Sequence, residues 1–235
     1  VEPDAVLCEM TPEHSHSDGS HKSVCKRFEQ LGYSVHVTDR MSSAFCGDST
    51  DRNRWFMLCF KLAGPSFDLL SYCQSDYSNA VDILDRPAEV SSDLWLDAPC
   101  EFRTRGKDTL PWGDEYPRDP RFLGQFISRA VLQGYAHGRR AKECKIWDVT
   151  RGPLPTVTRG SLLIVDGRTD RSSNVRWASV TECAKSMSFF PRQIAHLRRI
   201  GHDKAMEQIA GAVPCRTLYT AVSYTHLRAH ETFTD

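Results

Sequence analysis

The feature that most limits how this chain can fold is a continuous apolar run of strand length at residues 55–60. Six adjacent apolar residues leave no polar face, so a strand here must be buried on both sides, as the central strands of α/β sheets are. Shorter apolar segments at residues 4–8 and 33–37 also have strand character. Between them, residues 21–31 carry apolar side chains at helical spacing. The order strand, helix, strand, strand predicts an α/β sheet.

The middle of the chain lacks this regular spacing of apolar residues. Residues 66–150 are rich in Asp, Arg, Pro and aromatic residues and show weak periodicity, which predicts an irregular insertion. A short apolar run at residues 162–165 predicts a strand. Ser179 and Glu182 have the spacing of a helix capping box, so a helix is expected to begin there. A last helix is expected at residues 215–221.

Composition places the chain among ordinary globular proteins, with 40% hydrophobic and 26% charged residues. These proportions exclude a fibrous or wholly disordered chain. No uninterrupted apolar stretch approaches the roughly 18 residues that a membrane-spanning helix needs. We therefore expect no membrane segment.

Charge is balanced in total but unevenly distributed, with 30 Lys and Arg against 30 Asp and Glu. Residues 1–100 hold 8 basic and 16 acidic residues, whereas residues 101–160 hold 12 and 7. A basic segment favours an anionic partner, of which nucleic acid is the commonest. Two solvated faces of opposite sign explain the same pattern, and charge alone favours that simpler explanation.

The cysteines indicate a reducing compartment and no metal site. There are nine, an odd number, and no two are spaced as Cys-x-x-Cys. Most lie among apolar neighbours, which is typical of buried thiols in an intracellular protein. His14, His16 and His21 lie between Cys8 and Cys25, but the paired ligand spacing of a zinc site is missing.

The two ends of the chain differ from a natural terminus. Residues 222–232 match one translated frame of a sequencing adapter of the transposase-end type. This match predicts that natural sequence ends near Ala221 and that residues 222–235 are an adapter-derived tail; the alternative is a native terminal helix. Because the chain begins with Val1 rather than methionine, we also expect it to be part of a longer protein.

Five sequence blocks follow one another in a fixed order. The first is a strand that ends in a glutamate (residues 3–13), and the second is a turn with two arginines before the apolar run (43–56). The third contains a Thr-Val pair (150–157). The fourth is an arginine followed by a Glu-x-Ala helix and Phe-Pro (176–191), and the fifth contains Ala-Val-Pro (208–214). In order and content they resemble the sixth and eighth motifs, the end of the target recognition region, and the ninth and tenth motifs of the DNA (cytosine-5) methyltransferases.

Any one block alone is weak evidence for the family. Five blocks in the family's order, interrupted by one long insert, are specific evidence for it. The resemblance implies an α/β fold: the later strands of a doubly wound S-adenosylmethionine-dependent methyltransferase sheet, plus a small, irregular, mostly β target recognition domain. It assigns residues 1–62 to the C-terminal half of the catalytic domain, 63–177 to target recognition, and 178–221 to helices returning to the catalytic domain. It also implies a cytoplasmic enzyme of a bacterial or phage-infected cell, monomeric when complete.

Three residues are assigned to catalysis by this resemblance. A carboxyl at the end of a buried strand, Glu9, can hydrogen-bond or protonate ring nitrogen 3 of cytosine. Arg52 and Arg54 are two residues apart, so on an extended segment they face one side. A guanidinium fork can bind the cytosine oxygen, the role assigned to Arg54, while Arg52 supports it. The alternatives are a surface glutamate and an exposed charged turn.

The resemblance also implies contacts with double-stranded DNA and with S-adenosylmethionine. The target cytosine must leave the duplex to reach such a site. DNA contacts are expected from Arg151, Gly152, Thr156, Val157 and Arg176. Cofactor contacts are expected from Gly211, Ala212 and Val213.

The blocks also depart from the family pattern, and two family elements have no counterpart. Thr50 replaces a glutamine, and Gly211 stands where the family has asparagine. The Gly-x-Gly cofactor loop and the Pro-Cys-Gln nucleophile precede the first block in the family. Cys100 and Cys215 follow prolines, but Cys100 lies inside the insert and Cys215 belongs to the last block, so neither is expected to be the nucleophile.

We therefore expect a fragment of a DNA cytosine-5 methyltransferase that is inactive alone and completed by the missing N-terminal half of the same chain. Such an enzyme serves a restriction-modification system, a phage or an orphan methylation gene. Two alternatives stay open: a non-catalytic DNA-binding remnant, and an assembly product without a stable fold.

Overall fold

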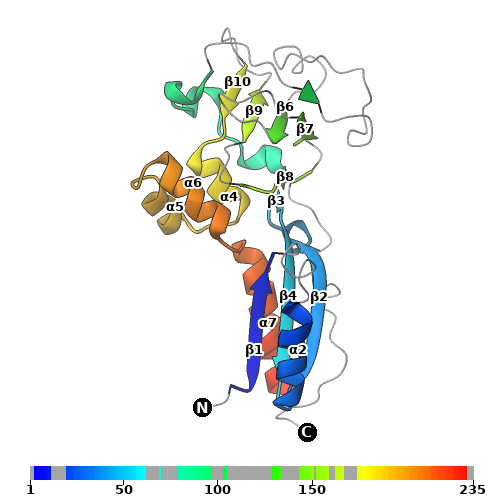
Figure 1. Cartoon of the computed structure of the whole chain (residues 1–235). Helices are drawn as coiled ribbons and strands as arrows, with labels where there is room; N and C mark the ends of the chain where they lie inside the picture. The colour runs from blue at the N-terminus through cyan, green and yellow to red at the C-terminus, as the bar shows by residue number, and fades with distance from the viewer. Residues whose placement is uncertain are drawn as a thin grey trace. The chain divides into compact units, whose positions relative to one another are not determined.

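The computed structural model describes residues 3–11, 20–61, 69, 73, 79–96, 103–104, 129–133, 143–150, 152–158, 162–166 and 174–231. The chain divides into two compact units (Figure 1). Unit 1 comprises residues 1–77 and 213–235, and unit 2 comprises residues 78–212. The division into three functional regions expected from the sequence stays a prediction.

Unit 1 is built on a three-stranded sheet. Its strands are β1 (Ala5–Met10), β2 (Ser34–Ser42) and β4 (Asn53–Phe60), in the order β1-β4-β2. β4 pairs antiparallel with both neighbours, so β1 and β2 run in the same direction on either side of it. Its residues from Trp55 to Cys59 are all fully buried, which confirms the strand with two buried faces predicted from the apolar run.

Two helices cover the two faces of this sheet (Figure 1). One is α2 (Ser20–Gln30), which joins β1 to β2, and the other is α7 (Cys215–Glu231). Alternate residues of β4 point to opposite faces. The face toward α2 carries Trp55, Met57 and Cys59, packed with Val24, Cys25 and Phe28. The face toward α7 carries Phe56 and Leu58, packed with Ala221 and Tyr224.

The order of elements at the start of the chain confirms the strand, helix, strand, strand prediction. The last helix begins at Cys215 as predicted but continues to Glu231 rather than ending at residue 221. Its extension includes Tyr224, which is buried against the sheet. That contact follows from an aromatic side chain at helical spacing from Ala221, whatever the origin of residues 222–232.

Unit 2 contains a five-stranded sheet. Its order is β10-β9-β6-β7-β5, antiparallel except for the β5–β7 pair. The strands are β5 (Arg103–Thr104), β6 (Arg129–Gln133), β7 (Glu143–Asp148), β9 (Leu163–Asp166) and β10 (Val175–Trp177). Three of them fall in residues 66–150, where weak periodicity predicted an irregular insertion and the family resemblance implied a mostly β domain. The strands agree with what the resemblance implied. β6 pairs with β9, about 30 residues further along the chain, and such pairing leaves no local periodicity.

Short helices surround the core of unit 2. They are η3 (Ala80–Ile83), η4 (Pro87–Glu89), η5 (Ser92–Leu94), α4 (Val180–Ser186), α5 (Pro191–Leu197) and α6 (His202–Gly211), and a short strand, β8, spans Leu154–Pro155. One apolar cluster joins η3, β9 and the helices α4 and α6, with Ile164, Cys183 and Met206 among its fully buried members. The predicted strand at residues 162–165 is confirmed as β9.

The start of α4 carries a buried ion pair. Ser179 caps the helix by accepting from the Glu182 amide at 3.1 Å, and Glu182 accepts from the Ser179 amide at 2.7 Å, which confirms the predicted capping box. The Glu182 carboxylate also accepts two bonds from the Arg176 guanidinium, at 2.6 and 2.8 Å. Both side chains are 0% exposed. A bidentate geometry offsets the cost of burying two charges only while both partners are present.

We predict that Arg176→Met destabilises unit 2 by about 3–5 kcal/mol, because it leaves the Glu182 carboxylate buried without its counter-charge. The matched control is Lys185→Met. Lys185 pairs with Asp85 at 3.1 Å but is 42% exposed, so this change should cost less than about 1 kcal/mol. Urea denaturation followed by tryptophan fluorescence measures both. Equal losses in the two variants would contradict the prediction.

Candidate active site

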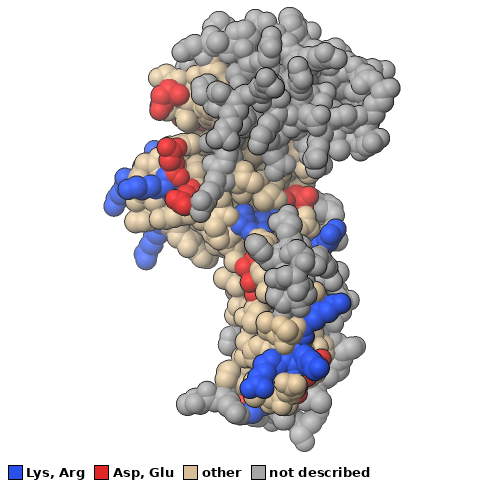
Figure 2. All heavy atoms as spheres, in the orientation of Figure 1, with Lys and Arg blue, Asp and Glu red and all other residues tan. Residues whose placement is uncertain are grey.

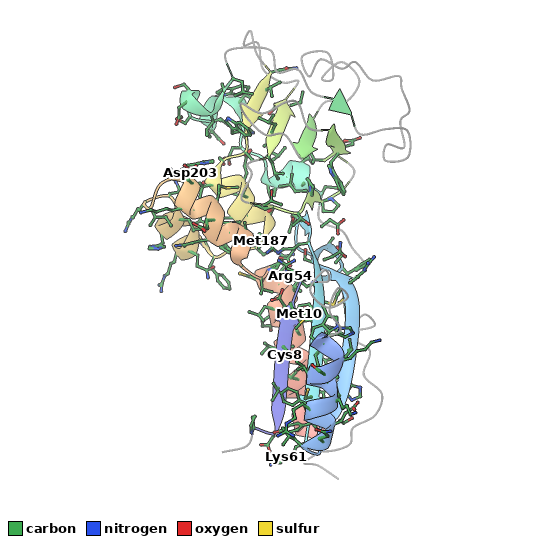
Figure 3. The ribbon with its side chains drawn as sticks, in the orientation of Figure 1. Cys8, Met10, Arg54, Lys61, Met187 and Asp203 are labelled. Carbon is green, nitrogen blue, oxygen red and sulfur yellow. The ribbon has the colours of Figure 1, made fainter. Side chains whose placement is uncertain are left out.

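The catalytic residues predicted from the sequence meet at one end of the unit 1 sheet. Glu9 lies opposite Phe56 in the β1–β4 register, and Arg54 lies two residues before Phe56 on the same face. Glu9 and Arg54 are therefore diagonal neighbours across two strands. Arg54 Nε lies 2.5 Å from Glu9 Oε1. Figure 3 shows Arg54 beyond Cys8 and Met10, at the end of the sheet opposite Lys61.

Arg54 is held in a fixed orientation. Its side chain is 9% exposed and that of Glu9 is 24% exposed. Besides Glu9, the guanidinium donates from Nη1 to the Asn53 carbonyl at 2.8 Å. A planar guanidinium fixed at two points presents its remaining edge in one direction, which a flexible ammonium cannot do.

Arg52 is placed by the turn that precedes it. The turn contains the helix η1 (Ser43–Cys46) and the short strand β3 (Thr50–Asp51). The Ser43 hydroxyl donates to the Thr50 carbonyl at 2.6 Å and accepts from the Arg52 amide at 3.1 Å. The Ser43 amide donates to the Arg52 carbonyl at 3.0 Å. One serine thus holds both backbone groups of Arg52, a role that sequence reasoning did not identify.

The charges of this site are coupled. Burial, and after it the neighbouring Arg54 cation, lower the pKa of Arg52 to about 10, while the Glu9 carboxylate acts in the opposite direction. Two cations and one carboxylate leave an excess positive charge in a largely buried place. Such a place attracts an oxygen acceptor or an anion. The three side chains expected to act together are therefore brought together.

A buried carboxylate joins the same turn to the start of α7. Asp48 is 0% exposed, and its Oδ2 accepts from the Thr217 amide at 3.1 Å and from the Thr217 hydroxyl at 2.8 Å. Arg216 donates to the Gly47 carbonyl at 2.8 Å. Asp48 caps α7 from 169 residues away, and an aspartate after a glycine is the only local sign of this role. Gly47 itself has φ +82°, which favours glycine.

The residues expected to contact DNA differ in their burial. Arg151 lies outside the described residues, as do most of residues 66–142. Gly152 and Thr156 are half-buried, while Val157 is 1% exposed and packs in the core of unit 2. Arg176 is 0% exposed and bound to Glu182 in a bidentate ion pair that stabilises the fold. Its expected contact with DNA stays a prediction.

The predicted cofactor residues link α6 to α7. Gly211 ends α6 and is exposed, with open space where a Cβ would stand. Ala212 and Val213 are half-buried. These residues could contact a ligand through backbone and small apolar side chains.

Several of the described thiols have a raised pKa. Burial raises the pKa of Cys8, Cys25 and Cys215, and raises that of Cys59 to about 12. A raised pKa keeps these groups as neutral thiols, which are poor nucleophiles. Cys100 lies outside the described residues.

Within the described part of the chain, no cluster of three His, Cys, Asp or Glu side chains has the arrangement of a metal site. No helix there combines the length and apolar character needed to cross a membrane. Figure 2 shows Lys and Arg side chains over α2 and on the outer side of α5. The exposed cations in those two regions are Lys22, Lys26, Arg27, Arg192, Arg198 and Arg199.

Comparison with solved structures places the fold among methyltransferases. No protein-family model and no curated protein matches the chain. Similar structures include a Dnmt2 methyltransferase from S. pombe, with 13% identity and a TM-score of 0.56 over 94% of this chain. The Entamoeba histolytica methyltransferase EhMeth has 11% identity and a TM-score of 0.59 over 95% of the chain. A putative DNA modification methyltransferase from an E. coli prophage has 15% identity and a TM-score of 0.56 over 97%.

These similarities confirm the predicted α/β fold class. At 11–15% identity they concern the fold alone. The chain spans 67%, 62% and 70% of the lengths of the three proteins.

We predict that Asp48→Ala destabilises unit 1 by about 1–3 kcal/mol, because it removes the cap of α7 and the buried partner of Thr217. Asp203→Ala is the matched control. Asp203 also lies near a helix start, that of α6, but its side chain is fully exposed, so the loss should stay under about 1 kcal/mol. The free energy of unfolding in urea measures both. A loss in Asp48→Ala no larger than in the control would remove Asp48 from this role.

Proposed function

We propose that this chain is part of a DNA cytosine-5 methyltransferase, which transfers a methyl group from S-adenosylmethionine to carbon 5 of a cytosine within a specific double-stranded DNA sequence. The observation that carries the proposal is the diagonal pair of Glu9 and Arg54, 2.5 Å apart at the end of the sheet. The order of the five sequence blocks and the methyltransferase fold support it.

The pair suits the chemistry of the cytosine ring. Carbon 5 of cytosine is a poor nucleophile until a thiolate adds to carbon 6 and makes an enamine. That addition is easier when ring nitrogen 3 is protonated or strongly hydrogen-bonded and when the exocyclic oxygen receives a hydrogen bond. In this proposal Glu9 binds nitrogen 3 and Arg54 binds the oxygen. The Arg52 guanidinium adds a second positive charge next to Glu9 and Arg54.

The rest of the catalytic apparatus is proposed to lie in a segment that precedes this chain. The raised pKa values of Cys8, Cys25, Cys59 and Cys215 argue against each of them as the thiolate that adds to cytosine. S-adenosylmethionine supplies the methyl group, and Gly211, Ala212 and Val213 are proposed to line part of its pocket. The accessible backbone at Gly211 is compatible with this.

DNA recognition is proposed to reside in unit 2. The target base must be turned out of the duplex to reach Glu9, so phosphate contacts must hold the distorted DNA. Residues 101–160 hold 12 Lys and Arg, and exposed arginines lie on and after α5. A non-catalytic DNA-binding remnant is the second candidate, and the methyl-transfer assay below separates the two.

The proposal is tested with the chain joined to its natural upstream coding sequence. Purified protein is incubated with duplex DNA and tritiated S-adenosylmethionine, and the DNA is digested to nucleosides for mass spectrometry. We expect label in 5-methyl-2′-deoxycytidine. Label in methylated adenine, or on the exocyclic nitrogen of cytosine, would exclude the proposed reaction. DNA binding without any methylation would favour the remnant.

In this protein, Glu9→Gln should lower methyl transfer by roughly a hundredfold or more, the contribution of a positioned acid–base group. DNA binding should largely survive, because the amide keeps the shape of the carboxyl. Glu29→Gln is the control, since Glu29 is exposed on α2. Single-turnover rates and a binding titration separate the two effects. Unchanged turnover in Glu9→Gln would remove Glu9 from the site.

Arg54→Ala should cost on the order of 2–4 kcal/mol in transition-state stabilisation, because the exocyclic oxygen of cytosine loses its donor in a largely dry pocket. Arg54→Lys should not restore the rate, since an ammonium lacks the planar fork that binds Glu9 and a second acceptor together. Arg27→Lys, an exposed change on α2, serves as the control. Full activity of Arg54→Lys would contradict the assignment.

A further inference from the structure

Two cysteines of unit 1 lie side by side next to the turn that holds Arg52. Cys46 is the last residue of η1, and its Sγ lies 3.5 Å from Cys73 Sγ. Cys73 Sγ also donates to the Leu69 carbonyl at 3.2 Å. Cys46 is 6% exposed, whereas Cys73 is half-buried and therefore reachable by a small solute. Nothing in the proposed methyl transfer uses either thiol.

Cys46 differs chemically from the other buried thiols. Its pKa is lowered, first by a hydrogen bond with Cys73 and then by hydrogen bonds with the hydroxyls of Thr217 and Thr220. These bonds outweigh burial and the repulsion of Asp48, which act in the opposite direction. By contrast, burial raises the pKa of Cys8, Cys25 and Cys59. Cys46 thus has more thiolate character, and thiolates carry out disulfide chemistry.

We propose that Cys46 and Cys73 are a site of reversible oxidation, joined as a disulfide by a peroxide. The accessible Cys73 thiol gives up its proton as its sulfur attacks one peroxide oxygen, which breaks the O–O bond, and the released hydroxide takes up a proton to become water. Cys73 becomes a sulfenic acid. Cys46, as thiolate, then attacks the Cys73 sulfur, forming the S–S bond and releasing the second hydroxide. Two thiols and one hydrogen peroxide give one disulfide and two waters.

The geometry favours this pair over other partners. The two sulfur atoms need to approach by only about 1.5 Å to reach the bond length of about 2.05 Å. The bond would close a loop that contains β3 and β4, from residue 47 to residue 72. It would fasten η1, whose Ser43 holds the backbone of Arg52, to residue 73. Oxidation therefore acts on the turn of the candidate active site without altering any residue placed in it.

The test uses the full chain. Reduced protein is treated with hydrogen peroxide, free thiols are blocked with iodoacetamide, and peptides are mapped by mass spectrometry without reduction. We expect a peptide pair linked through Cys46 and Cys73, lighter by two hydrogens and separated again by dithiothreitol, with a yield roughly tenfold above that of any other cysteine pair. Linkage of Cys46 or Cys73 mainly to other cysteines, or their conversion to sulfinic acids without linkage, would overturn the proposal.

Serine variants test which cysteines form the linked peptide. Cys46→Ser and Cys73→Ser should each abolish the linked peptide, whereas Cys25→Ser, on the opposite face of the sheet, should leave its yield unchanged. Oxidation should also move the urea midpoint of wild-type unit 1 upward, since a closed loop restricts the unfolded chain. The wild-type peptide map decides the matter even if a serine variant fails to fold. An unchanged yield in Cys73→Ser would contradict the assignment.

Discussion

Strand β4 is the element on which the architecture of unit 1 depends. It is hydrogen-bonded on both edges, to β1 and to β2, and it is buried on both faces. Each of its large apolar side chains contributes on the order of 1.5–3 kcal/mol when buried. Because the pairing register with β1 is fixed by this burial, Arg54 at the start of β4 must lie diagonally from Glu9. A slip of one residue would turn Arg54 to the other face.

Two arginine–glutamate pairs in this chain serve different purposes, and exposure distinguishes them. Arg176 and Glu182 are fully enclosed, six residues apart, and organise the start of α4 together with Ser179 and Asp85. Glu9 and Arg54 come from segments 45 residues apart in sequence, and Glu9 remains 24% exposed at the end of a sheet. The enclosed pair holds the fold of unit 2, whereas in the other pair the Glu9 side chain keeps part of its exposure. Residue type alone does not separate these roles.

The cysteine thiols on the two faces of the unit 1 sheet also have different environments and different pKa shifts. Under α2, Cys25 donates to the sulfur of Met57 at 3.5 Å, and Cys8, Cys25 and Cys59 are neutral thiols in an apolar cluster. Under α7, Cys46 lies within reach of Cys73 and of the hydroxyl groups of α7. Burial determines the pKa of the thiols under α2, whereas for Cys46 the hydrogen bonding with Cys73 and the hydroxyl groups of α7 outweighs burial.

The sequence by itself determined the α/β start of the chain, the doubly buried strand, the capping box at Ser179 and the grouping of Glu9, Arg52 and Arg54. Each of these rests on local periodicity, on a short spacing, or on the order of blocks along the chain. Only the tertiary structure decided that Asp48 caps α7, which segments of the insert form strands, and that Arg176 is enclosed by Glu182. These features depend on segments that meet across long separations or on burial, and neither leaves a local pattern in the sequence.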